Sequence, residues 1–198
     1  MVLISQLATA TCGRAAEKIV ARAERSASRG ATRLPIRWQP EVASRHWKTI
    51  VLHHSATASG DVATIDAQHR QRKDSAGKAW LGIGYHFVIG NGRGLDDGQV
   101  EPTFRWRQQL AGAHAGNTQQ NDSGIGICLI GNFNDTEPTA RQLAAIQELV
   151  TVLADQYKMN QQAVVRHLDV RATECPGRKF PFDQVVAPLP KGNSAASN

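Results

Sequence analysis

The sequence contains a group of side chains that could bind a metal ion and use it to activate water. Enzymes that use zinc hold it with three ligands drawn from His, Cys, Asp and Glu, and leave a fourth coordination position for water. The chain contains no CxxC pair and no HExxH motif, so spacing alone does not single out three ligands. The candidate ligands are five histidines and two cysteines: His53, His54, His86, His114, His167, Cys128 and Cys175.

One stretch, residues 164–177 with the sequence VVRHLDVRATECPG, holds two of these candidates. His167 ends a strand-like run, and Cys175 follows eight residues later, a spacing that suits a loop returning to the end of a strand. Pro176 and Gly177 come directly after the cysteine and would fix that return. The stretch therefore predicts half of a metal site, whose other half must come from elsewhere in the chain.

The neighbouring residues His53 and His54 cannot both contribute to one site, because successive side chains of a strand point to opposite faces of the sheet. The alternation does not indicate which of them faces the site, and we expect the other to pack under the sheet or to orient a neighbour. The choice between Cys175 and Cys128 is open in the same way, although Cys128 lies inside an apolar run and has the character of a small core residue.

Strand patterns surround these candidates. Short apolar, β-branched runs predict buried strands, and a Gly/Asn turn between two such runs predicts a hairpin. The predicted segments are a strand at residues 48–56, a hairpin at 83–102, a strand at 123–133 and a last short strand at 161–167 that delivers His167.

Helical patterns alternate with these strands. A helix with Asp61 or Ser59 as its cap is predicted at residues 59–74, and a second helix at 137–158 is predicted to start at Pro138. Strands mixed with long helices indicate an α/β fold. We therefore expect a single domain with a central mixed β-sheet flanked by helices.

The N-terminal region has a different composition from the rest. A helix is predicted at residues 14–28, followed by a linker at 31–47 whose Ile36 and Trp38 are expected to pack on the domain. The predicted organisation is a basic N-terminal helical extension at 1–46, the α/β domain at 47–184 and a flexible C-terminal tail at 185–198.

The net charge of +6 is located in this N-terminal region. Residues 14–48 carry nine Lys/Arg and three Asp/Glu, which gives 9 − 3 = +6, and the remainder carries 14 of each sign. A basic segment of this kind allows surface contact with an anionic wall polymer or a membrane. No nucleic-acid-binding motif is present and aromatic residues do not interleave with the charges, so we expect no nucleic-acid partner.

Targeting and redox signals are weak in this sequence. The chain has no run of 18 apolar residues, which predicts no transmembrane segment. The start, MVLISQLATATCG, has no basic residue before its apolar part, so a cleaved signal peptide is not expected. The three cysteines are far apart and odd in number, which does not resemble a disulfide framework.

Five motifs in order closely resemble the zinc-dependent N-acetylmuramoyl-L-alanine amidases, the family shared by phage lysozyme-amidases and peptidoglycan recognition proteins. The resemblance covers about residues 47–182. The motifs are VLHHSA, GIGYHFVIG, GAHAGN, NDSGIGICLIGNF and VVRHLDVRATECPG.

The resemblance implies a role for particular residues. It points to His53, His167 and Cys175 as ligands of Zn²⁺, which leaves His54 facing away. It implies that Tyr85 is catalytic. Thr173 stands where some phage members have lysine, and its hydroxyl would still donate a hydrogen bond to an oxyanion.

Two further residues, His114 and Asn117, are expected by the same resemblance to line the groove and bind the muramyl-peptide. The implied activity is hydrolysis of the amide between N-acetylmuramic acid and L-alanine in peptidoglycan, which places the action on the cell wall, in the periplasm or outside the cell. The alternative is a peptidoglycan-binding module of the same fold that does not cut. Because Cys175 and Tyr85 are both present, and loss of the cysteine ligand marks non-catalytic members, the sequence favours an enzyme.

Overall fold

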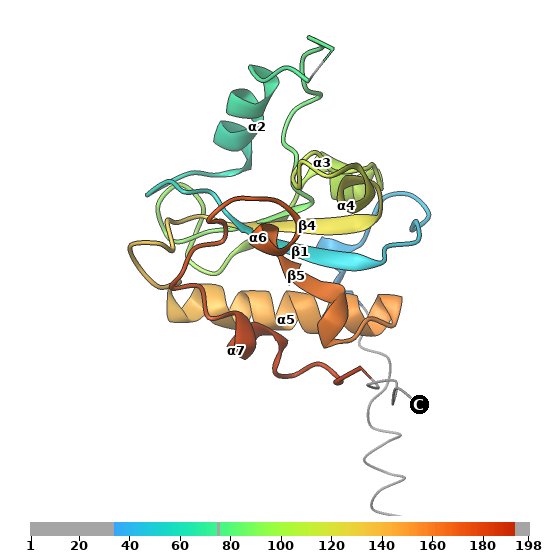
Figure 1. Cartoon of the computed structure of the whole chain (residues 1–198), viewed down its shortest axis with the longest axis vertical. Helices are drawn as coiled ribbons and strands as arrows, with labels where there is room; N and C mark the ends of the chain where they lie inside the picture. Colours follow the sequence, from blue (N-terminus) through green and yellow to red (C-terminus); the bar gives the residue numbers. More distant parts are fainter. Residues whose placement is uncertain (1–33, 75, 193–198) are drawn as a thin grey trace, which may run out of the picture. The chain divides into compact units, whose positions relative to one another are not determined.

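In the computed structural model, residues 34–74 and 76–192 are described. Five strands in this part of the chain form one sheet in the order β3-β2-β4-β1-β5. β4 pairs in parallel with β1 and β2, β1 pairs in parallel with β5, and β3 runs antiparallel to β2. The strands are β1 (Thr49–His54), β2 (Phe87–Ile89), β3 (Val100–Pro102), β4 (Gly124–Leu129) and β5 (Val164–Arg166). The mixed sheet flanked by helices confirms the predicted α/β fold (Figure 1).

The two faces of β4 carry different kinds of side chain. Ile125, Ile127 and Leu129 belong to the main hydrophobic core. Gly124, Gly126 and Cys128 alternate with them, so these small residues lie on the opposite face of the sheet. The run that the sequence shows as continuously apolar is therefore divided between a large-residue core face and a small-residue face that leaves room for other side chains.

The core face of the sheet is covered by α5 (Ala140–Tyr157), the longest helix among the described residues. Figure 1 shows α5 along one side of the sheet with α7 (Phe182–Val186) beside it, and α2, α3 and α4 on the opposite side. Thr139 caps α5: its Oγ1 accepts from the Gln142 backbone N–H, and the Gln142 side chain accepts from the Thr139 N–H, which is a capping box. The helix therefore begins one residue after Thr139, and the predicted start at Pro138 is too early.

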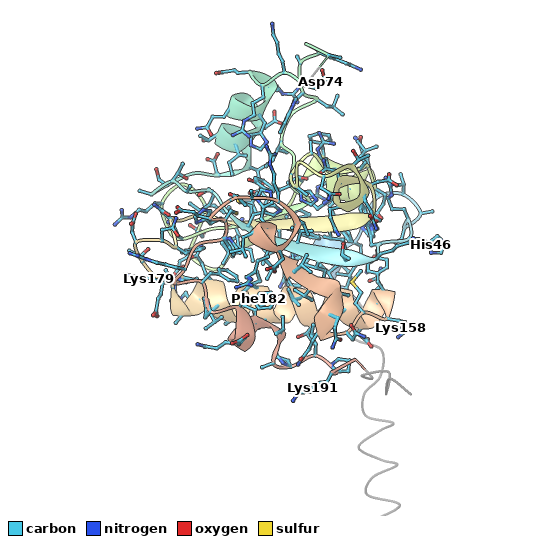
Figure 2. The ribbon with its side chains drawn as sticks, viewed as in Figure 1. His46, Asp74, Lys158, Lys179, Phe182 and Lys191 are labelled. Atoms are coloured by element: carbon cyan, nitrogen blue, oxygen red, sulfur yellow. The ribbon has the colours of Figure 1, made fainter. Side chains whose placement is uncertain are left out.

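The helix α2 (Val62–Arg70) begins at the predicted place, because Asp61 Oδ1 accepts a hydrogen bond from the Thr64 N–H at 2.7 Å. Asp61 rather than Ser59 is thus the cap. Figure 2 shows Asp74 at the outer end of the loop that follows α2, away from the sheet. The remaining short elements are η1 (Ile36–Trp38), α3 (Phe104–Arg107), α4 (Thr118–Ser123), η2 (Gln161–Ala163) and α6 (His167–Val170).

The linker before β1 packs differently from the prediction. Trp38 is buried as expected, and its carbonyl accepts a hydrogen bond from Trp106 Nε1 at 2.6 Å. Ile36, however, is 89% exposed, and Leu34 occupies the core instead. The short 3₁₀ turn of η1 separates Ile36 from the buried side of the linker, so the prediction for Ile36 is wrong. The helix predicted at residues 14–28 lies outside the described residues.

The C-terminal segment also packs more extensively than expected. Val185, Val186 and Leu189 are buried in the core cluster that contains α5. The tail predicted to start at residue 185 therefore starts too early, because these apolar side chains are covered by the helix. Within residues 34–74 and 76–192, no helix has the length and the apolar character needed to cross a membrane.

Candidate metal centre

Two histidines meet where β1 and β5 end. His53 is the fifth residue of β1, and His167 follows β5 directly. Leu52 lies opposite Arg166 in the parallel pairing of β1 and β5. His53 follows Leu52 and His167 follows Arg166, so the two histidines are also neighbours. Their ring centroids are 4.5 Å apart. The carboxyl ends of parallel strands are where α/β folds place their binding sites.

The thiol of Cys175 completes this group. Its Sγ lies 3.8 Å from His53 Nδ1, and the ligand atoms of His53, His167 and Cys175 all lie within 4.8 Å of one another. The Cys175 carbonyl accepts from the Leu168 N–H at 2.8 Å, which holds the loop back against the start of α6. The structure thus brings the three predicted ligands together although one of them is more than a hundred residues from the others.

Gly177 allows the chain to leave Cys175 in the required direction. Its φ is +102°, and a Cβ atom at this position would lie 2.4 Å from the backbone carbon of Phe133. Any other residue would meet both a left-handed backbone and a clash with main-chain atoms. The Pro-Gly pair that the sequence shows after the cysteine therefore has a physical function in setting the loop.

His54 points to the opposite face of the sheet, as the resemblance implies. Its Nδ1 accepts from the Phe133 backbone N–H at 3.1 Å, and its ring packs beside that of Phe133. Its own backbone N–H donates to Cys175 Sγ at 3.3 Å. His54 therefore supports the sulfur through its main chain while its imidazole organises the neighbouring loop.

The protonation of the two histidines suits a divalent metal ion, whereas the Cys175 thiol must lose its proton to bind one. Burial lowers the pKa of His53 well below its usual range, and neighbouring histidines lower it further. Burial also lowers the pKa of His167, so both rings are neutral near pH 7 and each has a free lone pair. Burial raises the pKa of the Cys175 thiol to about 11. Two neutral imidazoles and one sulfur are a donor set that fits Zn²⁺.

Tyr85 stands beside the cluster. Its ring centroid is 5.1 Å from that of His53, and its hydroxyl interacts electrostatically with the Cys128 thiol. Burial, followed by the two nearby cysteines, raises the pKa of Tyr85 well above its usual value, so the phenol keeps its proton. Cys128 faces the site because it lies opposite His53 in the β1–β4 pairing, but it is not one of the clustered ligands.

A small cavity opens next to Tyr85. Its volume is ≈ 50 Å³, which is enough for ordered water. His69, which the sequence did not single out, contributes to its wall, and its ring lies 5.5 Å from that of Tyr85. The wall also contains four hydroxyl side chains and one cation, from Ser55, Thr57, Ser59, Thr64 and Arg72.

Thr173 lies at the exposed rim of the site. Its Oγ1 accepts from the Cys175 backbone N–H at 3.3 Å, which leaves the hydroxyl proton free to donate. Glu174 is turned elsewhere, since its carboxylate accepts from Asn134 Nδ2 at 3.0 Å. The role that the resemblance implies for Thr173 stays a prediction.

His114 and Asn117, the two predicted substrate-binding residues, have other contacts. His114 is buried, and its Nδ1 lies 3.0 Å from His53 Nε2 while its Nε2 lies 3.2 Å from the Gly124 carbonyl. Asn117 caps α4 by accepting from the Gln120 N–H. Their substrate-binding roles stay predictions, whereas the contact between His114 and His53 is a feature that sequence reasoning missed.

Comparisons with known proteins found a family model and relatives that match this chain. A family model described as N-acetylmuramoyl-L-alanine amidase matches residues 43–178. Peptidoglycan-recognition protein SC2 of Drosophila melanogaster is 32% identical over 133 residues, which cover 64% of this chain and 66% of that protein's length.

Two solved structures are similar to the chain. The endolysin N-acetylmuramoyl-L-alanine amidase LysCS of Clostridium intestinale matches with a TM-score of 0.63 at 30% identity, covering 80% of this chain and 97% of that one. The ectodomain complex of the peptidoglycan recognition proteins LCa and LCx, with tracheal cytotoxin bound, matches with a TM-score of 0.53 at 26% identity, covering 74% and 86%.

Proposed function

The chain belongs to the N-acetylmuramoyl-L-alanine amidase family, and from this premise we propose that it hydrolyses the amide between N-acetylmuramic acid and L-alanine in peptidoglycan. The observation that carries the proposal is the cluster of His53, His167 and Cys175, whose ligand atoms lie within 4.8 Å of one another. A module that only binds peptidoglycan does not need three converging metal ligands beside a protonated tyrosine.

His53, His167 and Cys175 would hold Zn²⁺ in this site. When bound, zinc supplies Lewis acidity: it lowers the pKa of water toward about 7 and polarises a carbonyl group. With two neutral imidazoles and one thiolate as ligands, the zinc centre would keep a net charge of +1 and would remain a Lewis acid. The His54 backbone N–H donates to the Cys175 sulfur, and this hydrogen bond favours the thiolate form that binds a metal.

Two side chains beside the metal ligands would stabilise the negative charge that develops on the substrate oxygen. Tyr85 keeps its phenolic proton, because burial raises its pKa, and it can donate a hydrogen bond to the oxyanion that forms at the scissile carbonyl. Thr173 can donate to the same oxygen from the exposed side. One such donor contributes about 10²–10³ in rate, so the two hydroxyls together would account for a substantial part of the acceleration.

A second candidate function is recognition without cleavage. The similarity to the LCa and LCx complex, which holds tracheal cytotoxin, favours it, since that assembly has the same fold. The two functions differ in their products and not in their ligand. Binding alone leaves the muramyl-peptide intact, whereas hydrolysis separates the glycan from the stem peptide.

Product analysis decides between them. Purified peptidoglycan containing diaminopimelic acid, and a second preparation containing lysine, are incubated with the protein and analysed by mass spectrometry. We expect free stem peptides with an L-alanine amino terminus from at least one preparation. Sedimentation of the protein with both walls, without any released peptide, would establish the recognition function and contradict the enzymatic one.

The protonation of Cys175 predicts how zinc affinity depends on pH. Because burial holds the pKa of this thiol at about 11, metal binding must release its proton, whereas both histidines are already neutral above pH 7. The apparent affinity for zinc should therefore rise about tenfold per pH unit between roughly pH 7 and 9.

Competition with a chelator of known pH dependence measures this slope. Cys128→Ala is the matched control and should keep the slope, because Cys128 is a second buried thiol on the same face that is not one of the clustered ligands. An affinity that does not change with pH would mean that the cysteine is not a ligand.

A further inference from the structure

The hydrogen bonds behind His53 determine which of its nitrogens carries the proton. His114 Nε2 lies 3.2 Å from the Gly124 carbonyl, which can only accept, so this nitrogen must be the protonated one. A neutral imidazole has a single N–H. The His114 ring is buried, and the partners of its two nitrogens are an imidazole and a carbonyl with no carboxylate to balance a positive charge, so the neutral form is the stable one. Its Nδ1 is therefore an acceptor, and His53 Nε2 faces it at 3.0 Å.

The consequence for His53 follows directly. Its Nε2 must donate to His114, so its own single proton is on Nε2 and its Nδ1 is bare. That Nδ1 is the nitrogen that lies 3.8 Å from Cys175 Sγ, on the side of the proposed metal. The ring is thus held with its lone pair directed into the cluster.

The position of the proton on the second histidine, His167, is set by Ala115, the residue that follows His114. His167 Nε2 lies 3.2 Å from the Ala115 carbonyl, which again can only accept. His167 therefore also carries its proton on Nε2 and leaves Nδ1 free. Histidine ligands of metals commonly donate their other N–H to a carbonyl or carboxylate, which fixes the tautomer and the orientation of the ring.

We propose that the two-residue segment His114–Ala115 is the tautomer-setting element of the metal centre, and that both histidines bind zinc through Nδ1 because of it. The inference rests on the proposed function only in taking the bound metal to be zinc. His114 is then a positioning residue that acts through His53, and it does not need to touch substrate.

The structure holds this segment in place from two sides. Asn121 Oδ1 accepts from the backbone N–H of His114 at 2.9 Å and from that of Ala115 at 2.8 Å. The His114 ring lies against the bare surface of Gly126, where a Cβ atom would come within 2.5 Å of its Cδ2. The small-residue face of β4 therefore serves to admit this imidazole behind the ligand.

The tautomers can be read without any metal. Long-range ¹H–¹⁵N NMR correlations of metal-free protein distinguish the Nδ1–H from the Nε2–H form of each histidine. We expect His53 and His167 both to be Nε2–H in the wild type. Finding either ring as Nδ1–H would overturn the proposal.

Substitutions at His114 test the effect on metal affinity, measured by chelator competition. His114→Phe keeps an aromatic ring but offers no acceptor, and we expect zinc affinity to fall about 10–100-fold. His114→Asn places its side-chain oxygen as many bonds from Cα as Nδ1, so it should restore much of the affinity. His69→Phe, which removes a buried histidine outside the cluster, should leave zinc affinity unchanged.

The outcomes separate this inference from the proposed function. Equal zinc affinity in wild type and His114→Phe would overturn the inference even if the protein is an active amidase. If the wild type binds zinc with the expected tautomers but releases no stem peptide, the proposed function fails and the inference stands. If the wild type binds no zinc, the proposed function and the zinc-binding part of this inference both fail, and the NMR result decides the assignment of the tautomers. Thermal unfolding of each metal-free variant verifies that it is folded.

Discussion

Replacing Cys175 by alanine should abolish both zinc binding and amide hydrolysis. The substitution removes the only sulfur among the three clustered ligands and leaves two imidazoles, which form an incomplete site for a catalytic zinc. We expect a loss of zinc affinity of at least about 100-fold, since a structural zinc site of four ligands contributes about 10–16 kcal/mol in total. Metal content after dialysis and stem-peptide release are the two measurements.

The matched control for this substitution is Cys128→Ala, which removes the other buried free thiol of the described chain. It lies on the same face of the sheet but is not one of the clustered ligands, so the variant should retain one zinc per chain. Full zinc occupancy in Cys175→Ala would show that the wrong ligand has been assigned.

Replacing Tyr85 by phenylalanine should have the second-largest effect, and it should separate chemistry from metal binding. The variant keeps the ring that packs 5.1 Å from His53 and loses only the hydroxyl. Zinc content should be unchanged, while kcat falls about 10²–10³ with little change in KM, because the lost hydrogen bond acts on the transition state.

The chain provides its own control, because Tyr157 is the one other tyrosine. It lies at the end of α5, half-buried beside Trp106 and on the core face of the sheet. Tyr157→Phe should leave kcat unchanged. A Tyr85→Phe variant with wild-type kcat would remove the catalytic role of Tyr85, and one that loses zinc would indicate a structural role instead.

Much of the fold follows from local sequence patterns. The buried strand around His53, the hairpin, the helix capped by Asp61 and the long helix before His167 are all present. The helix capped by Asp61 ends at Arg70, before the predicted end at residue 74. Capping residues and hydrophobic periodicity are properties of residues close in the sequence, which is why these elements could be predicted. The start at Pro138 was misplaced because the Thr139–Gln142 capping box determines it.

The division of roles between His53 and His54 could not be read from periodicity. Ile50 and Leu52 on one side and Val51 on the other are all apolar, so both faces of β1 look buried. The resemblance pointed to His53, and the structure places its ring in the cluster because α5 covers the face that carries Ile50, Leu52 and His54.

The hydrogen bond that orients His53 could not be predicted from local sequence patterns either. The contact between His53 and His114 joins residues 61 positions apart, and it depends on Gly126 of a third segment. The exposure of Ile36 and the burial of Leu189, at the two ends of the domain, could not be predicted from local patterns for the same reason. Whether such apolar residues are covered depends on the three-dimensional path of the chain and not on their own character.

The most direct test of the central claim is a titration of metal-free protein with Zn²⁺, followed through the L-alanine amino termini released from peptidoglycan. The account predicts no release without metal, a rise in proportion to added zinc, and a plateau at one zinc per chain. Full activity in the metal-free protein, or no released amino termini at saturating zinc, would contradict it.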